Sequence, residues 1–295
     1  PTKKVVSPPP TVTKPTVTVV SNQTITLAPP NPNELIDLSD TYSPDCLDPA
    51  TGFFGSDASI FNAVYQELVA FNGSDHLHVV PMLATNWTII GYQHYIFTLR
   101  QGVYFTDGEP FNATVVWFSF YRTIIMGQGP GVSNYGELLF SMTKYSETGY
   151  AIPWGACHAL AYATGNNAYI SNATLCAYAL AEVLSNFNVQ NATIQKLMTY
   201  PDQAVVVLGP YKVEINLLHP YRYFLLDIAS WWGAIVPPAY VDEHGGVQPN
   251  TPSSGYLCQY GVPGTGPYEI ESVTGTPGEF TEIILKANPN YWGNN

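Results

Sequence analysis

Residues 95–122, YIFTLRQGVYFTDGEPFNATVVWFSFYR, constrain the fold more than any other part of the chain. Apolar side chains alternate through 95–99 at the two-residue period of a β-strand. Gln101-Gly102 can turn the chain into a second short strand at 103–105, and Asp107-Gly108 then ends this ribbon. Pro110 and Asn112 suit the entry to a helix. Its apolar side is formed by Val115, Phe118, Tyr121 and Ile125. This block therefore predicts a strand, a turn, a second strand and an aromatic helix.

The charge balance of the chain argues against nucleic acid and membrane surfaces as partners. Only 11% of the 295 residues are charged, and acids outnumber bases 22 to 10. Three of those bases, Lys3, Lys4 and Lys14, precede the first acidic residue. The rest of the chain is strongly acidic and would repel a phosphate backbone. No Lys/Arg cluster lies beside an amphipathic helix, so no peripheral membrane site is indicated.

Cysteines and glycosylation sequons indicate an extracellular protein. The four cysteines, Cys46, Cys157, Cys176 and Cys258, include no CxxC pair, so no zinc site is expected. Two disulfides fit an oxidising environment, although three pairings are possible and four buried free thiols are the alternative. Six N-x-S/T sequons predict glycosylation at Asn22, Asn72, Asn86, Asn112, Asn172 and Asn191.

Neither a membrane span nor a signal sequence is expected. No apolar run reaches 18 residues, and the start of the chain lacks the charged region followed by a long apolar region that is typical of a signal sequence. The chain begins at Pro1 rather than Met, as expected for a processed or trimmed product. We therefore expect an extracellular or cell-surface location.

The N-terminal residues 1–32 are rich in Pro, Thr and Val and have two interpretations. Such a composition cannot build a core, so the segment could be an extended stalk. Within it, residues 11–28 contain alternating Thr and apolar side chains that are typical of strands. The alternative is therefore a strand donated to a neighbouring copy of the chain.

The remaining pattern predicts an α/β fold. A short strand is expected at 33–40 and a helix from Ala58 to about Phe71, ended by Asn72-Gly73. Further expected elements are helices near 173–185, 191–199 and 220–229, and hairpins formed by 204–218 and by strands on either side of 276–278.

Five blocks in this order resemble family 5 extracellular solute-binding proteins, which deliver peptides, nickel or oligosaccharides to ABC importers. The matching blocks are Leu47–Ala50, Pro81 to Trp87, 95–122, Gly264–Tyr268 and 288–293. The resemblance covers 34–125 and 203–293, and the ordered combination is far more specific than any single block. It implies a periplasmic-binding-protein-like lobe of type II, cluster C, with mixed β-sheets and flanking helices.

The resemblance also implies a domain plan and a disulfide pairing. After the stalk or donor strand at 1–32, residues 33–295 would form the first lobe, with 33–50 and 203–295 as a core subdomain and 51–202 as an inserted one. Cys157–Cys176 would staple the insertion, and Cys46–Cys258 would join two segments near the family's ligand cleft. Family members are about twice as long, so the second lobe is expected to be absent from these residues. Either they are a fragment of a longer protein, or the single lobe has another use.

The residues predict binding rather than catalysis. The histidines are scattered, and His76 and His78, the closest pair, are more typical of a solvated loop than of a metal site. No nucleophile, phosphate-binding or metalloprotease motif occurs, so no catalytic residue, metal or cofactor is expected. Because adjacent tryptophans in an extended segment cannot both enter one core, one of Trp231 and Trp232 should be free to stack on a ligand.

Other candidate ligand contacts follow from the resemblance to the family's cleft. They are Tyr42, Phe53, Phe54 and Asp57 near the first matching block, and Gly266 and Tyr268 in the fourth. The implied function is noncatalytic capture of a peptide or oligosaccharide for an ABC transporter permease. The alternative is a structural subunit of an extracellular filament or surface layer, in which copies assemble through residues 11–28.

Overall fold

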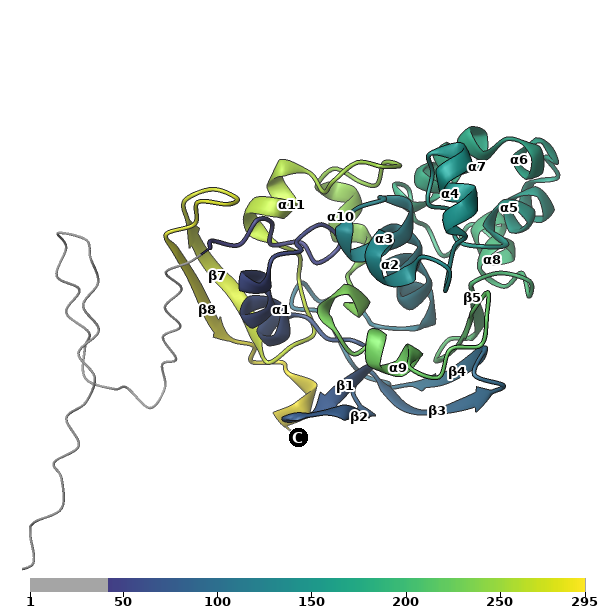
Figure 1. The fold of residues 1–295 in the computed structure, drawn as a ribbon. Coiled ribbons are helices and arrows are strands. Elements are labelled where there is room, and N and C mark those ends of the chain that lie inside the picture. Colours follow the sequence, from purple (N-terminus) through teal and green to yellow (C-terminus); the bar gives the residue numbers. More distant parts are fainter. Residues whose placement is uncertain (1–41, 295) are drawn as a thin grey trace, which may run out of the picture. The chain divides into compact units, whose positions relative to one another are not determined.

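The computed structural model describes residues 42–294 (Figure 1). The predicted stalk or donor strand at 1–32 and the predicted strand at 33–40 lie outside the described residues. No helix in the range 42–294 is long and apolar enough to cross a membrane.

A four-stranded antiparallel sheet with the order β3-β4-β6-β5 forms the centre of the fold. Its strands are β3 (Ala84–Ile90), β4 (His94–Leu99), β5 (Val205–Gly209) and β6 (Lys212–Asn216). Tyr95 and Phe97 of β4 lie opposite Ile215 and Val213 of β6, and all four side chains are buried. The apolar side chains that alternate in the sequence of β4 therefore lie on the buried face of this sheet. The predicted strand at 95–99 and the predicted hairpin at 204–218 are both confirmed.

Helix α2 (Ala113–Ile125) packs against β5 and β6. Asn112 caps its N-terminus, where the side-chain Oδ1 accepts a hydrogen bond from the backbone N of Thr114 at 2.8 Å. Every residue of α2 except Thr114 is buried. Because the helix is enclosed on all sides, its apolar surface is wider than the single stripe that the sequence predicted.

The predicted second strand at 103–105 is wrong. Only an isolated bridge joins Tyr104 to Pro110, so the segment before α2 is a loop. Its backbone is still held, because the N–H of Phe105 bonds to the carbonyl of Glu109 at 2.9 Å. The buried side chains of Val103 and Phe105 therefore anchor the loop to the core, although the segment forms no β-ladder.

The predicted helix at 58–71 is also wrong in its second half. Helix α1 (Ala58–Val64) is followed by β1 (Val69–Asn72), which pairs with β2 (Asp75–Pro81). Asn72-Gly73 is the turn of this hairpin rather than a helix end, and Gly73 has a φ of +60°. The apolar side chains of 64–71 fit both periods, and pairing with β2 decided the outcome.

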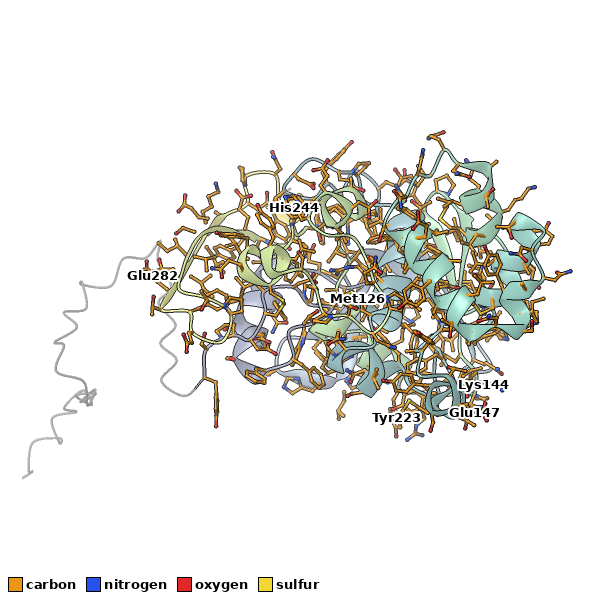
Figure 2. All side chains as sticks on the ribbon, turned by 90° about the horizontal axis from the view of Figure 1, so that it is seen from above. Met126, Lys144, Glu147, Tyr223, His244 and Glu282 are labelled. Atoms are coloured by element: carbon orange, nitrogen blue, oxygen red, sulfur yellow. A yellow bond between two sulfur atoms is a disulfide. The ribbon has the colours of Figure 1, made fainter. Side chains whose placement is uncertain are left out.

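Residues 126–200 contain six helices, which lie together at one side of the structure in Figure 1. They are α3 (Gly129–Tyr135), α4 (Met142–Thr148), α5 (Ala156–Thr164), α6 (Ala168–Ser171), α7 (Ala173–Leu184) and α8 (Ala192–Met198). The two predicted helices, near 173–185 and 191–199, are confirmed as α7 and α8. A disulfide between Cys157 and Cys176 joins α5 to α7. Figure 2 shows Lys144 and Glu147 of α4 at the edge of the molecule and buried Met126 near its middle.

The C-terminal region begins with short helices and ends in a hairpin. The helices are α9 (Phe224–Asp227), η2 (Trp231–Gly233), α10 (Pro238–Glu243) and α11 (Gly255–Tyr260). Strands β7 (Tyr268–Thr274) and β8 (Glu282–Ala287) form the predicted hairpin, and η3 (Trp292–Asn294) follows. Helix α9 is shorter than the 220–229 expected. The four-stranded sheet takes strands from both sides of the expected subdomain boundary at 202/203, and the division stays a prediction.

Candidate functional site

Helix α1 is the point where the predicted ligand-contacting segments meet. Residues 53–57 lead directly into it, and η2 packs against both α1 and α3. At its other end, the N–H of Gly266 donates to the carbonyl of Val64 at 2.9 Å. The structure therefore gathers around one short helix three segments that are far apart in the sequence.

The segment before α1 presents exposed aromatic side chains. Phe53 and Phe54 are 39% and 49% exposed, and Tyr42 is 69% exposed. The rings of Tyr42 and Phe54 meet edge to face at 6.4 Å between centroids. Phe53 lies against Gly129 at the start of α3, where a Cβ atom would collide with its ring. Exposed aromatic rings fixed by their neighbours can stack on an apolar or planar ligand group.

Asp57 is not available at the surface, unlike these aromatic residues. It is fully buried, its Oδ2 accepts the N–H of Phe54 at 2.9 Å, and its Oδ1 accepts the N–H of Asp45 at 3.3 Å. Burial raises the pKa of Asp57 to about 8, and a hydrogen bond with the Asp45 carboxyl adds to the shift. Asp57 therefore supports the loop from inside.

Trp231 and Trp232 form a 3-10 turn rather than the extended segment expected from the sequence. Their rings meet edge to face at 4.9 Å, and both side chains are half-buried. In a 3-10 turn, successive side chains point about 120° apart, whereas in a strand they point to opposite sides, so these two rings can touch. Both indole N–H groups are buried without an acceptor within the described residues.

Gly266 and Tyr268 differ in what they can offer a ligand. Gly266 is buried, and the backbone of α1 leaves no room there for a Cβ atom. Its absence of a side chain is thus explained by packing. Tyr268 is 44% exposed at the start of β7 and is free to meet a ligand. Ligand contact by any of the eight predicted residues stays a prediction.

A cavity of about 100 Å³ lies beside the C-terminal end of α1. It is lined by Val64, Thr106, Tyr240, Tyr260, Val262, Pro263, Gly264, Glu269 and Ile270. None of the eight predicted ligand residues belongs to this lining. A space of this size holds a few water molecules or one small side chain, not a peptide.

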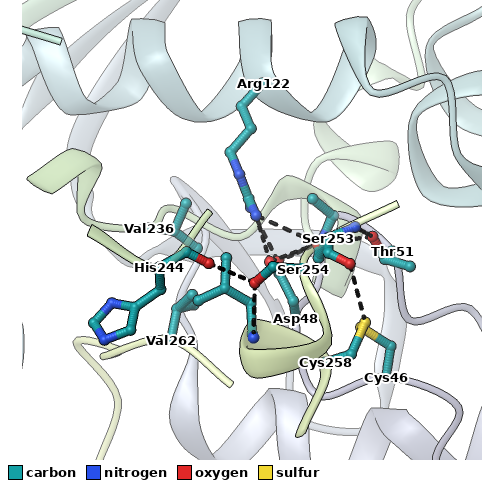
Figure 3. Close-up of polar contacts among 12 residues, drawn as sticks. Cys46, Asp48, Thr51, Arg122, Val236, His244, Ser253, Ser254, Cys258 and Val262 are labelled. Atoms are coloured by element: carbon teal, nitrogen blue, oxygen red, sulfur yellow. Dashed lines mark hydrogen bonds and ion pairs between the residues drawn. A yellow bond between two sulfur atoms is a disulfide. The ribbon is translucent and has the colours of Figure 1, made fainter. Parts of the chain in front are cut away.

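A buried ion pair joins Arg122 of α2 to Asp48, in the loop that precedes α1 (Figure 3). It was not predicted from the sequence. Arg122 of α2 donates from Nη1 to Oδ1 of Asp48 at 3.0 Å, and its Nη2 contacts Oδ2. Ser253 Oγ also donates to Oδ2 of Asp48 at 2.7 Å. Burial disfavours the Asp48 carboxylate, but Arg122 and Ser253 outweigh it, so the pKa of Asp48 is lowered. The sequence did offer one signal for this pair, because Asp48 and Arg122 both lie in blocks that match the family.

The predicted disulfide pairing is present in the structure. Cys46–Cys258 links the loop before α1 to α11, and the N–H of Leu47 bonds to the carbonyl of Cys258 at 2.9 Å. With Asp48 held by Arg122, residues 46–52 are fastened to two separate elements. This loop is therefore a rigid base for Phe53 and Phe54.

A cluster of polar contacts, which the sequence analysis did not predict, holds the Trp292 side chain of η3 in place. Gln66 Oε1 accepts hydrogen bonds from Trp292 Nε1 at 2.7 Å and from Thr265 Oγ1 at 3.0 Å. The Arg100 guanidinium lies 3.9 Å from the centre of the Trp292 ring. These contacts explain why the matching blocks around 100, 265 and 292 occur together.

The candidate catalytic and metal groups do not converge. Among the described residues no group of three or more His, Cys, Asp or Glu side chains could hold a metal ion. His78 pairs with Asp75 at 2.7 Å on an exposed strand. Glu109 accepts the N–H of Ala239 at 3.2 Å, and burial raises its pKa to about 7, while neighbouring Asp107 is exposed.

Comparison with known proteins assigns the family. Residues 78–295 match the family described as bacterial extracellular solute-binding proteins, family 5 Middle. The chain belongs to this family. Its members are binding proteins rather than enzymes, in agreement with the prediction of a noncatalytic protein.

Two curated relatives extend over different shares of the chain. The probable D,D-dipeptide-binding periplasmic protein DdpA of Escherichia coli strain K12 is 23% identical over 267 residues, or 89% of this chain and 37% of that protein. The uncharacterized protein YhjP of Bacillus subtilis strain 168 is 30% identical over 103 residues, or 35% of this chain and 17% of that protein. The chain therefore spans well under half the length of these relatives.

Solved structures share the fold of a type II periplasmic binding protein. The pheromone receptor PrgZ aligns with a TM-score of 0.56 at 16% identity, covering 85% of this chain and 39% of that one. The murein tripeptide binding protein MppA of Escherichia coli aligns with a TM-score of 0.51 at 19% identity, covering 85% and 37%. The predicted α/β class is confirmed.

Proposed function

We propose that this chain is one lobe of an extracellular receptor that captures peptides and delivers them to an ABC transporter permease. The observation that carries the proposal is the meeting of three segments around α1, with exposed Phe53, Phe54 and Tyr268 and the half-buried tryptophan pair. Aromatic rings on a rigid base can contact peptide side chains.

The names of similar proteins favour a peptide over other ligands. The Escherichia coli relative is described as D,D-dipeptide-binding, and the two structures cited above are described as binding a murein tripeptide and a peptide. The oligosaccharide ligand and the filament subunit have no support from these comparisons. The filament would also depend on residues 11–28, which lie outside the described part of the chain. We therefore propose a peptide ligand alone.

A binding lobe of this kind encloses its ligand by closing against a second surface. With the chain matching only 37% of the DdpA length, that second surface would come from another part of a longer receptor. We expect the lobe alone to bind weakly, because about half of the contacts would be missing.

Thermal unfolding in the presence of candidate ligands tests the proposed function. A ligand that binds only the folded state raises the Tm. We expect D-alanyl-D-alanine or tri-alanine at millimolar concentration to raise it, and maltotriose to have no effect. The proposal fails if neither peptide raises the Tm, or if maltotriose raises it as much as the peptides do.

Replacing Phe54 with alanine locates the site. Phe54→Ala should lower peptide affinity about tenfold, the effect of losing one well-placed aromatic contact. Tyr162→Ala is the matched control, because Tyr162 is 65% exposed on α5, outside the segments that meet at α1. Isothermal titration should show no change in the control. Equal losses in both variants would contradict the assignment.

A further inference from the structure

The aromatic ring of Phe53 lies against a glycine at the start of helix α3. A Cβ atom added to Gly129 would be 2.6 Å from Cδ1 of Phe53, 3.0 Å from Cγ and 3.2 Å from Cε1. Carbon atoms in ordinary contact are about 3.5–4.0 Å apart. The ring therefore fills the space that any side chain at position 129 would need.

The backbone at Gly129 does not itself require glycine. Gly129 is the first residue of α3 and its φ is not positive, so alanine could adopt the same backbone and would favour the helix. Gly131 is different, because a Cβ atom there would collide with the carbonyl oxygen of Thr123 in α2. Gly131 thus serves the packing of two helices, whereas Gly129 makes room for the ring of Phe53.

The backbone of Phe53 is fixed independently of this contact. Its N–H donates to Oδ1 of Asp45 at 3.1 Å, and the loop that carries it is fastened by the Cys46–Cys258 disulfide. Where the ring points then depends on the side-chain torsions, and the contact with Gly129 selects one orientation. The ring is not enclosed there, because Phe53 remains 39% exposed.

Helix α3 also contacts the tryptophan pair. It packs against η2, and the hydroxyl of Tyr135 at its other end donates to the carbonyl oxygen of Trp232 at 3.0 Å. Its contacts with α2 join it to the scaffold, and Figure 1 shows the two helices side by side. One short helix therefore supports two of the aromatic segments that we assign to the peptide site.

We propose that Gly129 is a positioning residue for this site, and that its missing side chain lets Phe53 lie where it can contact an aromatic side chain of the peptide. The ligand part of this inference rests on the proposed function, whereas the contact between Phe53 and Gly129 does not. Because the ring lies at the surface, a methyl group at 129 moves the ring and leaves the core in place. The variant then changes ligand selection more than it changes the fold.

Fluorine NMR tests the contact without any ligand. In protein labelled with 4-fluorophenylalanine, the Phe53 resonance is assigned by its absence from Phe53→Leu. In Gly129→Ala it should move toward the position of the free amino acid, because the ring leaves α3. Gly255→Ala is the matched control, since Gly255 is the first residue of α11 and a Cβ atom there would meet nothing within 4 Å. An unchanged Phe53 resonance in Gly129→Ala overturns the inference.

A double variant keeps this test decisive if Gly129→Ala does not fold. Phe53→Ala combined with Gly129→Ala should fold in that case, because the ring that excludes the methyl group is gone. Thermal unfolding of the single and double variants measures this. A double variant that also fails to fold would show that position 129 excludes a side chain for another reason, and it overturns the inference.

Peptide selectivity tests the positioning role. In isothermal titration the wild type should bind Ala-Phe-Ala at least about fivefold more tightly than tri-alanine, because the ring of Phe53 can pack on the added ring. In Gly129→Ala this ratio should fall at least about threefold, and in Gly255→Ala it should stay as in the wild type. A general loss of structure would weaken both peptides by the same factor and leave the ratio unchanged.

A double-mutant cycle decides whether Gly129 acts through Phe53. Phe53→Ala should lower the ratio as Gly129→Ala does, and adding Gly129→Ala to it should change nothing further. A ratio that is unchanged in Gly129→Ala, or that falls again in the double variant, overturns the positioning role. If neither peptide binds the wild type, the proposed function fails, and the fluorine resonance still decides whether Gly129 orients the ring.

Discussion

At the residue scale, one pair of opposite charges lies inside the protein rather than at its surface. Arg122 is 1% exposed and donates to Asp48, which is itself fully buried. Ser253 and the N–H of Ala50 complete the shell of Asp48. Removing one partner of a buried ion pair strongly lowers the free energy of unfolding, because the charge that remains has neither a counterion nor water around it. The arrangement ties α2 to the loop that carries Phe53 and Phe54.

Arg122→Met should destabilise the protein strongly. The substitution preserves most of the side-chain volume but leaves the Asp48 carboxylate buried without its cation, and a loss of about 3–5 kcal/mol in the free energy of unfolding is expected. Urea denaturation followed by circular dichroism measures it. Lys144→Met is the matched control, because Lys144 pairs with Glu147 on an exposed face of α4 and its loss should cost less than about 1 kcal/mol. Equal effects would mean that the buried pair has no special role.

At the element scale, α2 and the central sheet form the scaffold of the site. The helix packs against β5 and β6, and Arg122 reaches from it to the α1 loop. Its N-terminus depends on Asn112, whose Oδ1 accepts from the N–H of Thr114 and from the Thr114 hydroxyl. Asn112 is also the first residue of a predicted glycosylation sequon, and its Oδ1 is already engaged within the chain.

Asn112→Ala should remove the cap of α2. The expected cost is about 1 kcal/mol, because the first backbone N–H groups of the helix lose their acceptor. Asn112→Asp keeps an oxygen in the same place and should restore most of the stability. Both variants also remove the sequon, so their comparison is independent of glycosylation. Equal stability of the two variants in thermal unfolding would rule out the capping role.

At the scale of the whole molecule, two disulfides close loops of very different length. Cys46–Cys258 joins residues 212 positions apart, and Cys157–Cys176 joins residues 19 positions apart. A crosslink removes more conformational freedom from the unfolded chain when the loop it closes is longer. The first therefore ties the loop before α1 to α11, whereas the second joins two helices of one region.

Removing the two disulfides separately should reveal this difference. Replacing Cys46 and Cys258 with alanine should cost about 5 kcal/mol, and replacing Cys157 and Cys176 about 3 kcal/mol, in the chain-entropy account. Chemical denaturation of the two double variants beside the wild type makes the comparison. A larger loss from the Cys157/Cys176 variant would show that local packing, rather than loop length, dominates.

Local patterns in the sequence were sufficient for much of the fold. The alternation at 95–99, the cap at Asn112 and the hairpins at 204–218 and around 276–278 are short-range features, and each appears as predicted. The ordered family blocks also indicated the fold class and the disulfide pairing. Predictions failed where the choice depended on a pairing partner outside the segment itself. The segment 65–71 fits a helix or a strand, and pairing with β2 selected the strand.

What the sequence by itself determined is therefore the family, the fold class and the aromatic segments that could meet a ligand. Only the tertiary structure decided how those segments combine. It buried Asp57 beside Asp45, turned Trp231 and Trp232 into a helical turn, and placed Arg122 against Asp48. The physical reason is that burial and the pairing of charges depend on residues brought together by the whole fold, and no local pattern of side chains specifies them.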